Sequence, residues 1–425
     1  MKAVIMAGGK GTRVASVCAT LPKPMLPLGG MPILARQIAV LRREGFTDIV
    51  LVVGHLGAVI KEYFGDGSAF GVCVSYVEET EPLGTAGALA LLKDTLAGDD
   101  FLLLCGDLLF DVDLARFLAY HCEKKGLATI LTHPSNHPRD SVLVATDKEG
   151  HVTAFLPPDS ERPSHRNATN AGLHFFSPKI LERFAEVKKT DLDREVLRPL
   201  AASGELYAYR SPEYVRDMGT PERLLEGERA IAAGRVGKSN LKTLQRAVFL
   251  DRDGTINRHI GFLKKPDELI LLDGVAEAIC RLHEAGFLVI VATNQPVLAR
   301  GEVTEEGLLA IHARLEELLG EKGAILDDIF YCPHHPDKGF AGEVKALKIP
   351  CSCRKPAPGL LLAAAAKYNI DLTRSYMIGD GAADVLAGRA AGCRTAVLGT
   401  HPDADFCGNS LLDCVEQILK AEDTK

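Results

Sequence analysis

Residues 3–13 read AVIMAGGKGTR, and residues 247–255 read AVFLDRDGT. Each stretch begins with a short apolar run, which predicts a buried strand, and continues into a polar turn. The first turn is rich in glycine, so its successive backbone N–H groups can bind an anion such as a phosphate. The second turn offers two carboxylates instead. The same structural pattern therefore begins twice along the chain, with different chemistry at each turn.

Both halves of the chain alternate apolar runs with helical patterns, which predicts an α/β protein with two Rossmann-like domains. We expect each sheet to be mostly parallel and covered by helices on both faces. The first half has expected strands at residues 3–6, 49–53, 72–76, 101–104 and 129–132, and a helix at 33–44. The second half has expected strands at 248–250, 288–292, 329–331, 375–378 and 395–398, and helices at 274–285, 304–319, 359–368 and 383–391.

A length of 425 residues favours two or three domains. We place the first domain at residues 1–232, an Ala/Gly/Lys-rich linker at 233–244 and the second domain at 245–425. The net charge of −7 gives no reason to expect nucleic acid or an anionic membrane as a partner. No apolar run approaches the roughly 18 residues that span a bilayer, and we expect a cytoplasmic protein. The oligomeric state stays open.

The glycine turn of the first half is followed by a lysine held between two prolines. Pro22 and Pro24 restrict the backbone around Lys23, so its ammonium group can be presented to an anion with little loss of entropy. The alternative is a solvated surface lysine. Further along, Asp107 follows the apolar run 101–104, as a metal ligand at the carboxyl end of a strand would. Its alternative role is to cap a turn or a helix.

Six segments of the first half occur in the order typical of one enzyme family. They are residues 7–13 (AGGKGTR), 22–27 (PKPMLP), 81–87 (EPLGTAG), 105–107 (CGD), 170–172 (NAG) and 217–222 (DMGTPE). On these segments the first half resembles the sugar-1-phosphate nucleotidyltransferases. The resemblance implies that a sugar phosphate oxygen attacks the α-phosphorus of a nucleoside triphosphate and that pyrophosphate leaves. Such a reaction needs a hard cation and fixed Lys or Arg donors.

The resemblance also assigns residues to these tasks. The triphosphate is expected to lie on the glycine loop, and Lys23 and Arg13 are the expected catalytic cations. Asp107 and Asp217 are the expected Mg²⁺ ligands, with Asp107 also at the nucleotide. Asn170 and Gly172 are expected to face the sugar. The expected nucleotide-binding residues are Gly8, Gly9, Gly11, Thr12, Arg13, Gly84, Thr85 and Asp107.

One segment departs from this family. Its members usually carry a Glu-Lys pair shortly before the Asn-Ala-Gly segment, and that lysine contacts the sugar phosphate. Residues 155–162 of this chain read FLPPDSER instead. Arg162 and Arg166 are the candidate replacements.

In the second half, two carboxylates stand two residues apart after a buried strand. Displacing a phosphoryl group needs a nucleophile and an acid for the leaving oxygen, and we assign these roles to Asp251 and Asp253. Thr293 at the end of the next strand and Lys355 are expected to complete a clamp around the phosphate. Asp380 ends a further strand, and Asp384 follows on the same helical face.

This order of motifs resembles the haloacid-dehalogenase-type phosphatases. The resemblance implies Mg²⁺ on Asp251, Asp380 and the main-chain carbonyl of Asp253. Within the superfamily, the stretches that match best resemble D-glycero-D-manno-heptose-1,7-bisphosphate 7-phosphatases and histidinol-phosphatases. They are residues 250–257 (LDRDGTIN), 293–295 (TNQ), 299–301 (ARG) and 353–356 (CRKP). Residues expected to contact the substrate are Asn257, Asn294, Arg354 and Lys355. Many relatives have Ser-Gly after Thr-Asn-Gln, where this chain has Pro-Val.

Three of the eleven cysteines stand close to a histidine in the sequence. Cys332, His334, Cys351 and Cys353 supply a Cys₃His set that suits tetrahedral Zn²⁺, and a complete protein ligand set predicts a structural site. Zinc would hold the loop from which Arg354 and Lys355 project. The alternative is three unligated cysteines and a surface histidine, and His335 is the nearest rival ligand.

Together the two resemblances imply one bifunctional enzyme of nucleotide-activated heptose synthesis, serving surface polysaccharide or glycoprotein glycans. A sugar bisphosphate would lose its 7-phosphate in the second domain. The resulting sugar 1-phosphate would be coupled to a nucleotide in the first domain. GTP is the favoured donor, and UTP and CTP stay open. A different sugar 1-phosphate, a first half that only senses nucleotide sugar, and a histidinol-phosphatase in the second half also stay open.

Overall fold

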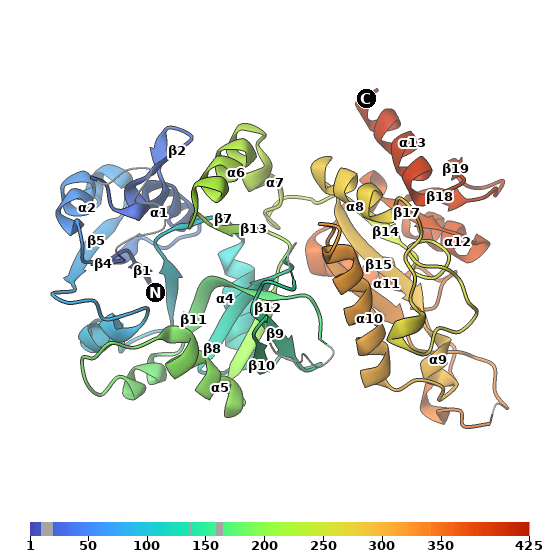
Figure 1. Ribbon diagram of the computed structural model, residues 1–425, viewed down its shortest axis with the longest axis horizontal. Helices are drawn as coiled ribbons and strands as arrows, with labels where there is room; N and C mark the ends of the chain where they lie inside the picture. The colour runs from blue at the N-terminus through green and yellow to red at the C-terminus, as the bar shows by residue number, and fades with distance from the viewer. Residues whose placement is uncertain (10–19, 136–137, 159–164, 340, 425) are drawn as a thin grey trace. The chain divides into compact units, whose positions relative to one another are not determined.

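The computed structural model describes residues 1–9, 20–135, 138–158, 165–339 and 341–424 (Figure 1). These residues form two compact units. Unit 1 consists of Met1–His133, Val144–Leu156 and Thr169–Asn240. Unit 2 consists of Leu241–Lys425 and two shorter stretches, Pro134–Leu143 and Pro157–Ala168. Nothing in the sequence pattern indicates that these two stretches belong to unit 2, and the domain limits 1–232 and 245–425 stay a prediction.

The described part of unit 1 is built on a 9-stranded mixed sheet. Strand β1 (Lys2–Met6) lies in its centre, parallel to β4 (Asp48–Val53) on one side and to β6 (Phe101–Cys105) on the other. Strand β11 (Thr169–Phe176) runs antiparallel to β6. The remaining strands of the sheet are β5 (Cys73–Glu78), β8 (Ala128–His133), β9 (Leu143–Thr146), β10 (Val152–Leu156) and β12 (Leu206–Arg210).

Two short ribbons and a set of helices complete unit 1. The ribbons pair β2 (Pro27–Leu28) with β3 (Met31–Pro32), and β7 (Leu108–Asp111) with β13 (Tyr214–Asp217). The helices are α1 (Ile33–Arg43), α2 (Gly57–Phe64), α3 (Lys93–Leu96), α4 (Leu114–Lys124), α5 (Arg198–Ala202), α6 (Pro221–Ala232) and α7 (Arg235–Lys238).

Strand β1 is buried on both faces of its sheet. Ile5 packs in one apolar cluster with helix α1, and Val4 packs in another cluster on the opposite face. Successive side chains of a strand point to opposite faces, so a strand covered on both sides needs a continuous apolar run. This is why the run that begins at residue 3 could be identified as a central strand from the sequence.

The sheet of unit 2 has six strands in the order β16-β15-β14-β17-β18-β19, and all neighbouring strands are parallel. The strands are β14 (Ala247–Leu250), β15 (Leu288–Asn294), β16 (Asp328–Cys332), β17 (Tyr376–Gly379), β18 (Arg394–Leu398) and β19 (Phe406–Gly408). The helices are α8 (Val275–Glu284), α9 (Pro296–Ala299), α10 (Glu305–Gly320), α11 (Gly359–Tyr368), α12 (Ala382–Ala391) and α13 (Leu411–Asp423).

Helices cover both faces of this second sheet (Figure 1). Val248 and Leu250 pack against residues of α8, α10 and α13 in one cluster. Phe249 packs against residues of α11 in the other. The carboxyl ends of β14, β15 and β17 therefore meet at one edge of the sheet, where the polar motifs begin.

The predicted fold class, two Rossmann-like α/β domains, is confirmed. Every strand expected in either half is present, although β5 and β17 each begin one residue later than expected and extend to Glu78 and Gly379. The sheet of unit 1 is less parallel than expected, because β11 runs antiparallel to both β6 and β8. In the predicted linker the chain forms a short helix, α7.

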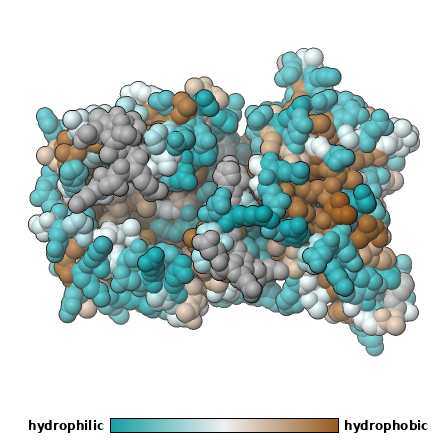
Figure 2. Space-filling view, in the orientation of Figure 1, coloured by the Kyte–Doolittle hydropathy of each residue, from teal (hydrophilic) through white to brown (hydrophobic). Residues whose placement is uncertain are grey.

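Among the described residues, no helix combines the length and the apolar character needed to cross a bilayer. Figure 2 shows a mainly hydrophilic visible surface, on which apolar residues gather most densely on unit 2.

Candidate functional site

Three carboxylates meet at the carboxyl edge of the sheet of unit 2. Asp251 directly follows β14, Asp380 follows β17, and Asp384 lies in the first turn of α12. One carboxylate oxygen of each lies within 4.8 Å of the others. Hard oxygen ligands at this spacing suit Mg²⁺. The sequence places Asp384 on the same face as Asp380, but the spacing alone does not assign it as a ligand.

Burial and a neighbouring negative charge raise the pKa of two of these carboxylates. Burial raises the pKa of Asp380, and the charge of Asp251 raises it further. Burial also raises the pKa of Asp384, although Lys355 acts in the opposite direction. A divalent cation bound between Asp251 and Asp380 would relieve their repulsion, so these two predicted ligands suit Mg²⁺.

Lys355 lies beneath this cluster with its side chain 2% exposed. Its Nζ is 2.8 Å from Oδ1 of Asp251 and 2.6 Å from Oδ1 of Asp384. Burial alone lowers the pKa of Lys355, but the two carboxylates outweigh it and the net shift is upward. The ammonium group therefore stays charged, as binding a phosphoryl group requires.

Asp253 is held by three neighbouring side chains. Arg252, Asn257 and Gln295 each donate to its carboxylate. Burial raises the pKa of Asp253, but the charge of Arg252 and these hydrogen bonds bring the net shift below its ordinary value. Arg252 and Gln295 were not identified from the sequence as site residues, and their position beside the motif residues was the available signal.

Two residues expected to contact the substrate use their amides within the protein. The side chain of Asn294 donates to the carbonyl of Lys355 and accepts from the N–H of Lys355, both at 3.0 Å. Asn257 donates to Oδ1 of Asp253 and to the carbonyl of Arg258. In this structure both side chains therefore hold residues predicted to be catalytic. Arg354 donates to the carbonyl of His334 at 3.2 Å.

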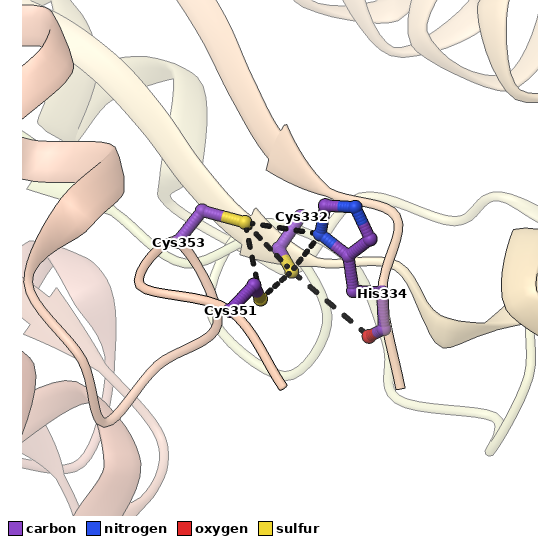
Figure 3. A group of neighbouring side chains, drawn as sticks. All are labelled: Cys332, His334, Cys351 and Cys353. Carbon is purple, nitrogen blue, oxygen red and sulfur yellow. Dashed lines mark hydrogen bonds between the residues drawn. The ribbon is translucent and has the colours of Figure 1, made fainter. Parts of the chain in front are cut away.

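Three cysteines and one histidine of unit 2 converge on one point: Cys332, His334, Cys351 and Cys353 (Figure 3). Sγ of Cys353 lies 3.2 Å from Sγ of Cys332 and 3.3 Å from Sγ of Cys351, and Nδ1 of His334 lies 3.3 Å from Sγ of Cys353. Sulfurs joined in a disulfide would be about 2 Å apart. Tetrahedral zinc with Zn–S bonds of about 2.3 Å would separate its ligands by about 3.8 Å. The donor set and its spacing thus fit a structural metal ion.

In unit 1, Lys23 and the predicted metal ligands Asp107 and Asp217 lie near Cys105. Lys23 forms an ion pair with Asp107, and Asp217 forms one with Arg223. The carbonyl of Asp107 accepts from the N–H of Met218 at 2.8 Å, which joins the two predicted metal-ligand segments. Burial raises the pKa of Cys105 to about 12, with Asp107 adding to the rise, Lys23 opposing it and Asp217 contributing least.

The predicted nucleotide loop is described only in part. Gly8 and Gly9 lie within the described residues, whereas Gly11, Thr12 and Arg13 lie outside them. A Cβ atom at Gly8 would lie 2.3 Å from Oε2 of Glu79, while one at Gly9 would meet no atom of the described residues within 4 Å. Gly8 therefore permits close packing against Glu79.

Gly84 and Thr85 lie against the chain around Thr190. Gly84 has φ +81°, and a Cβ atom there would lie 2.5 Å from the carbonyl oxygen of Thr190. The hydroxyl of Thr85 accepts from the N–H of Leu192 at 2.7 Å. In this structure both residues fix the backbone of the predicted nucleoside segment.

The predicted sugar segment is held by hydrogen bonds between its own residues. Oδ1 of Asn170 accepts from the N–H of Gly172 and is 3.0 Å from Nε2 of His174. Arg166, a candidate replacement for the family lysine, is bound elsewhere: its guanidinium meets the carboxylate of Glu316 at 2.9 and 3.0 Å within unit 2. Arg162, the other candidate, lies outside the described residues.

Comparison with known proteins assigns the chain to two enzyme families. A family model described as nucleotidyl transferase matches residues 2–234, and one described as haloacid dehalogenase-like hydrolase matches residues 143–392. The chain therefore belongs to the nucleotidyl transferases through its first half and to the haloacid dehalogenase-like hydrolases through its second. It therefore joins members of two enzyme families in one polypeptide.

Three relatives show which members of these families the chain is similar to. A D-glycero-beta-D-manno-heptose-1,7-bisphosphate 7-phosphatase of Yersinia pestis is 44% identical over 181 residues, covering 40% of this chain and 94% of that protein. A mannose-1-phosphate guanylyltransferase of Mycobacterium tuberculosis is 35% identical over 234 residues, covering 55% of this chain and 65% of that protein. A UTP--glucose-1-phosphate uridylyltransferase of Synechocystis is 34% identical over 217 residues, covering 48% and 56%. The chain thus spans less than two thirds of either transferase relative.

Proposed function

We propose that this protein carries out two consecutive steps of nucleotide-activated heptose synthesis. Unit 2 removes the 7-phosphate of heptose 1,7-bisphosphate, and unit 1 transfers a nucleotidyl group, GMP being favoured, to the heptose 1-phosphate that remains. The phosphatase step is supported by the similarity to the Yersinia enzyme along 94% of its length. The guanylyl donor is supported by the similarity to the mycobacterial enzyme.

The observation that carries the phosphatase half is the buried Lys355 between Asp251 and Asp384. A carboxylate oxygen of Asp251 attacks phosphorus, the bond from phosphorus to the sugar oxygen breaks, and that oxygen takes a proton from Asp253. Water then attacks the phosphorus of the aspartyl phosphate and gives a proton to Asp253, while the bond from phosphorus to the Asp251 oxygen breaks and inorganic phosphate leaves. Lys355 neutralises phosphoryl charge throughout. Mg²⁺, when bound by Asp251, Asp380 and the carbonyl of Asp253, would supply further charge neutralisation.

In unit 1, Lys23 and Asp107 form the core of the proposed transfer site. Asp107 and Asp217 would hold Mg²⁺, and Lys23 would then be released to a phosphate oxygen. Gly8 and Gly9 begin the loop on which the triphosphate would lie. The zinc ion that we propose for Cys332, His334, Cys351 and Cys353 would support the loop of Lys355.

A comparison of substrates tests this proposed function. We expect phosphate release from heptose 1,7-bisphosphate at a kcat/KM at least about 10²-fold above that for histidinol phosphate, the difference a site achieves when it hydrogen-bonds its own substrate. We expect pyrophosphate release from GTP with heptose 1-phosphate, and less from UTP or CTP. A preference for UTP with another sugar would favour a uridylyltransferase. No pyrophosphate with any pair of substrates would favour a unit 1 that only senses nucleotide sugar.

Replacing Cys351 by serine is expected to remove zinc from the protein. Because metal binding to a structural site is coupled to folding, the free energy of unfolding of unit 2 should fall by about 3 kcal/mol. Metal content by elemental analysis and a denaturant titration check both effects. The exposed Cys407→Ser variant is the matched control. Unchanged zinc content in Cys351→Ser would remove the zinc assignment.

Replacing Gly254 by alanine is expected to lower phosphate release by about tenfold or more, because catalysis depends on sub-ångström placement of the reacting groups. Gly254 has φ +86°, and a Cβ atom there would lie 2.0 Å from Oδ2 of Asp380. The matched control is Gly323→Ala, where φ is +74° and a Cβ atom would meet nothing within 4 Å. Equal kinetics for the two variants would show that backbone strain, not the contact with Asp380, matters at Gly254.

A further inference from the structure

The carboxylate of Asp253 is saturated with hydrogen bonds from the protein. Its Oδ1 accepts from Nε of Arg252 at 3.2 Å and from Nδ2 of Asn257 at 2.9 Å. Its Oδ2 accepts from a terminal nitrogen of Arg252 at 2.7 Å and from Nε2 of Gln295 at 3.1 Å. A carboxylate offers about four lone-pair sites. One of these donors must therefore withdraw before Asp253 can share a proton with a substrate oxygen.

The donors differ in how easily they can withdraw. Arg252 is 0% exposed, and a fully buried guanidinium that lost its carboxylate would be left as an uncompensated charge. Asn257 is also 0% exposed, and its amide is shared with the carbonyl of Arg258. Gln295 is neutral, like Asn257, but its bond to Asp253 is longer, at 3.1 Å against 2.9 Å, so Gln295 is the donor that we expect to withdraw.

Gln295 also determines which way the hydroxyl of Thr293 points. Its Nε2 donates to Oγ1 of Thr293 at 2.9 Å as well as to Asp253. An amide nitrogen carries two hydrogens, and these two acceptors use both. Since Thr293 accepts here, its own O–H is left to donate toward the phosphate position. The opposite orientation of the Gln295 amide would set its oxygen against the carboxylate of Asp253.

The backbone fixes the place from which this side chain extends. The N–H of Gln295 donates to the carbonyl of Cys332 at 2.8 Å, directly after the pairing of β15 with β16. The residue is 1% exposed. Gln295 is therefore a buried, anchored group that bridges the phosphate-binding threonine and the acid/base aspartate.

We propose that Gln295 is a positioning residue of the phosphatase, aiming the hydroxyl proton of Thr293 at the phosphoryl group and holding Asp253 until the sugar oxygen takes its place. Gln295 exchanges no proton itself: the proton moves between Oδ2 of Asp253 and the sugar oxygen as the phosphorus–oxygen bond breaks. This inference rests on the proposed phosphatase function.

Two variants and two substrates test the proposal in the full-length protein. Gln295→Met keeps the length of the side chain and removes both donors, whereas Gln295→Glu keeps the shape and offers only acceptors. Heptose 1,7-bisphosphate has a basic leaving oxygen that needs a proton, and p-nitrophenyl phosphate has a leaving group that is stable as an anion. A general acid matters for the first substrate and hardly for the second.

For Gln295→Met we expect kcat on the bisphosphate to fall about 10²-fold while KM changes less than about threefold. On the aryl phosphate we expect a loss of about tenfold, from the misdirected Thr293 hydroxyl alone. Gln295→Glu should be worse than Gln295→Met on both substrates, because it draws the Thr293 proton to itself and repels Asp253.

The matched control is Gln417→Met, a glutamine of α13 that donates to the carbonyl of Cys407 and lies outside the site. It should leave both rates unchanged. Equal losses on the two substrates, or no loss in either Gln295 variant, would overturn the proposal. A wild-type protein that releases phosphate from neither substrate would overturn the proposed function as well, so the two failures can be told apart.

Discussion

Replacing Asp251 by asparagine is expected to abolish phosphate release and to leave nucleotidyl transfer intact. The amide cannot attack phosphorus, and loss of a covalent nucleophile lowers kcat by about 10⁴-fold or more. The substitution also removes one of the two carboxylates that contact Lys355, but Asp384 remains at 2.6 Å to hold the ammonium group. Release of inorganic phosphate from heptose 1,7-bisphosphate measures the loss, and pyrophosphate release from GTP measures the activity that should persist.

The matched control for this variant is Asp267→Asn, an exposed carboxylate of unit 2 away from the cluster. It should behave as wild type in both assays. If Asp251→Asn lost both activities while retaining its folded structure, the two sites would not be independent.

Replacing Asp107 by alanine is expected to have the opposite effect. The variant should lose pyrophosphate release by about 10³-fold, because a proposed metal ligand is gone at the point where negative charge accumulates. It should release phosphate from the bisphosphate at the wild-type rate. Lys23 would also lose its ion-pair partner. We expect that raising the Mg²⁺ concentration restores little activity, because one ligand of the site is missing.

Asp99→Ala, an exposed carboxylate of unit 1, is the control for Asp107→Ala. A variant Asp107→Ala that keeps full transfer activity would remove Asp107 from the metal site. It would leave Asp217 and Lys23 as the groups to test next.

The central strands could be predicted from the sequence because both of their faces are buried. The runs that form β1, β6, β14 and β15 are continuously apolar, which is the pattern that such strands require. The antiparallel strand β11 was missed as a strand. Its sequence TNAGLHFF begins with polar residues and a glycine, and Gly172 has φ +80°. An irregular strand of this kind is defined by its neighbours β6 and β8 rather than by its own composition.

The residue types at the candidate sites could also be predicted, because each motif lies at the end of a strand or in a loop with recognisable ligand residues. The direction in which each side chain points could not be predicted. Asn294 was expected at the substrate, yet its amide pairs with the main chain of Lys355, which is far away in sequence. The membership of Pro134–Leu143 and Pro157–Ala168 in unit 2 likewise depends on tertiary contacts, such as that of Arg166 with Glu316. Neither the local pattern nor the spacing carries that information.

We propose that one chain removes a phosphate and then adds a nucleotide to the same sugar. The most direct test is ³¹P NMR of the protein with Mg²⁺, GTP and heptose 1,7-bisphosphate, with the α and β anomers followed separately. We expect the 7-phosphate signal to give way to inorganic phosphate first, and GDP-sugar and pyrophosphate signals to follow with the anomeric phosphate retained. Loss of the anomeric phosphate, or a 7-phosphate that disappears while GTP and every other nucleoside triphosphate stay unchanged, would contradict this claim.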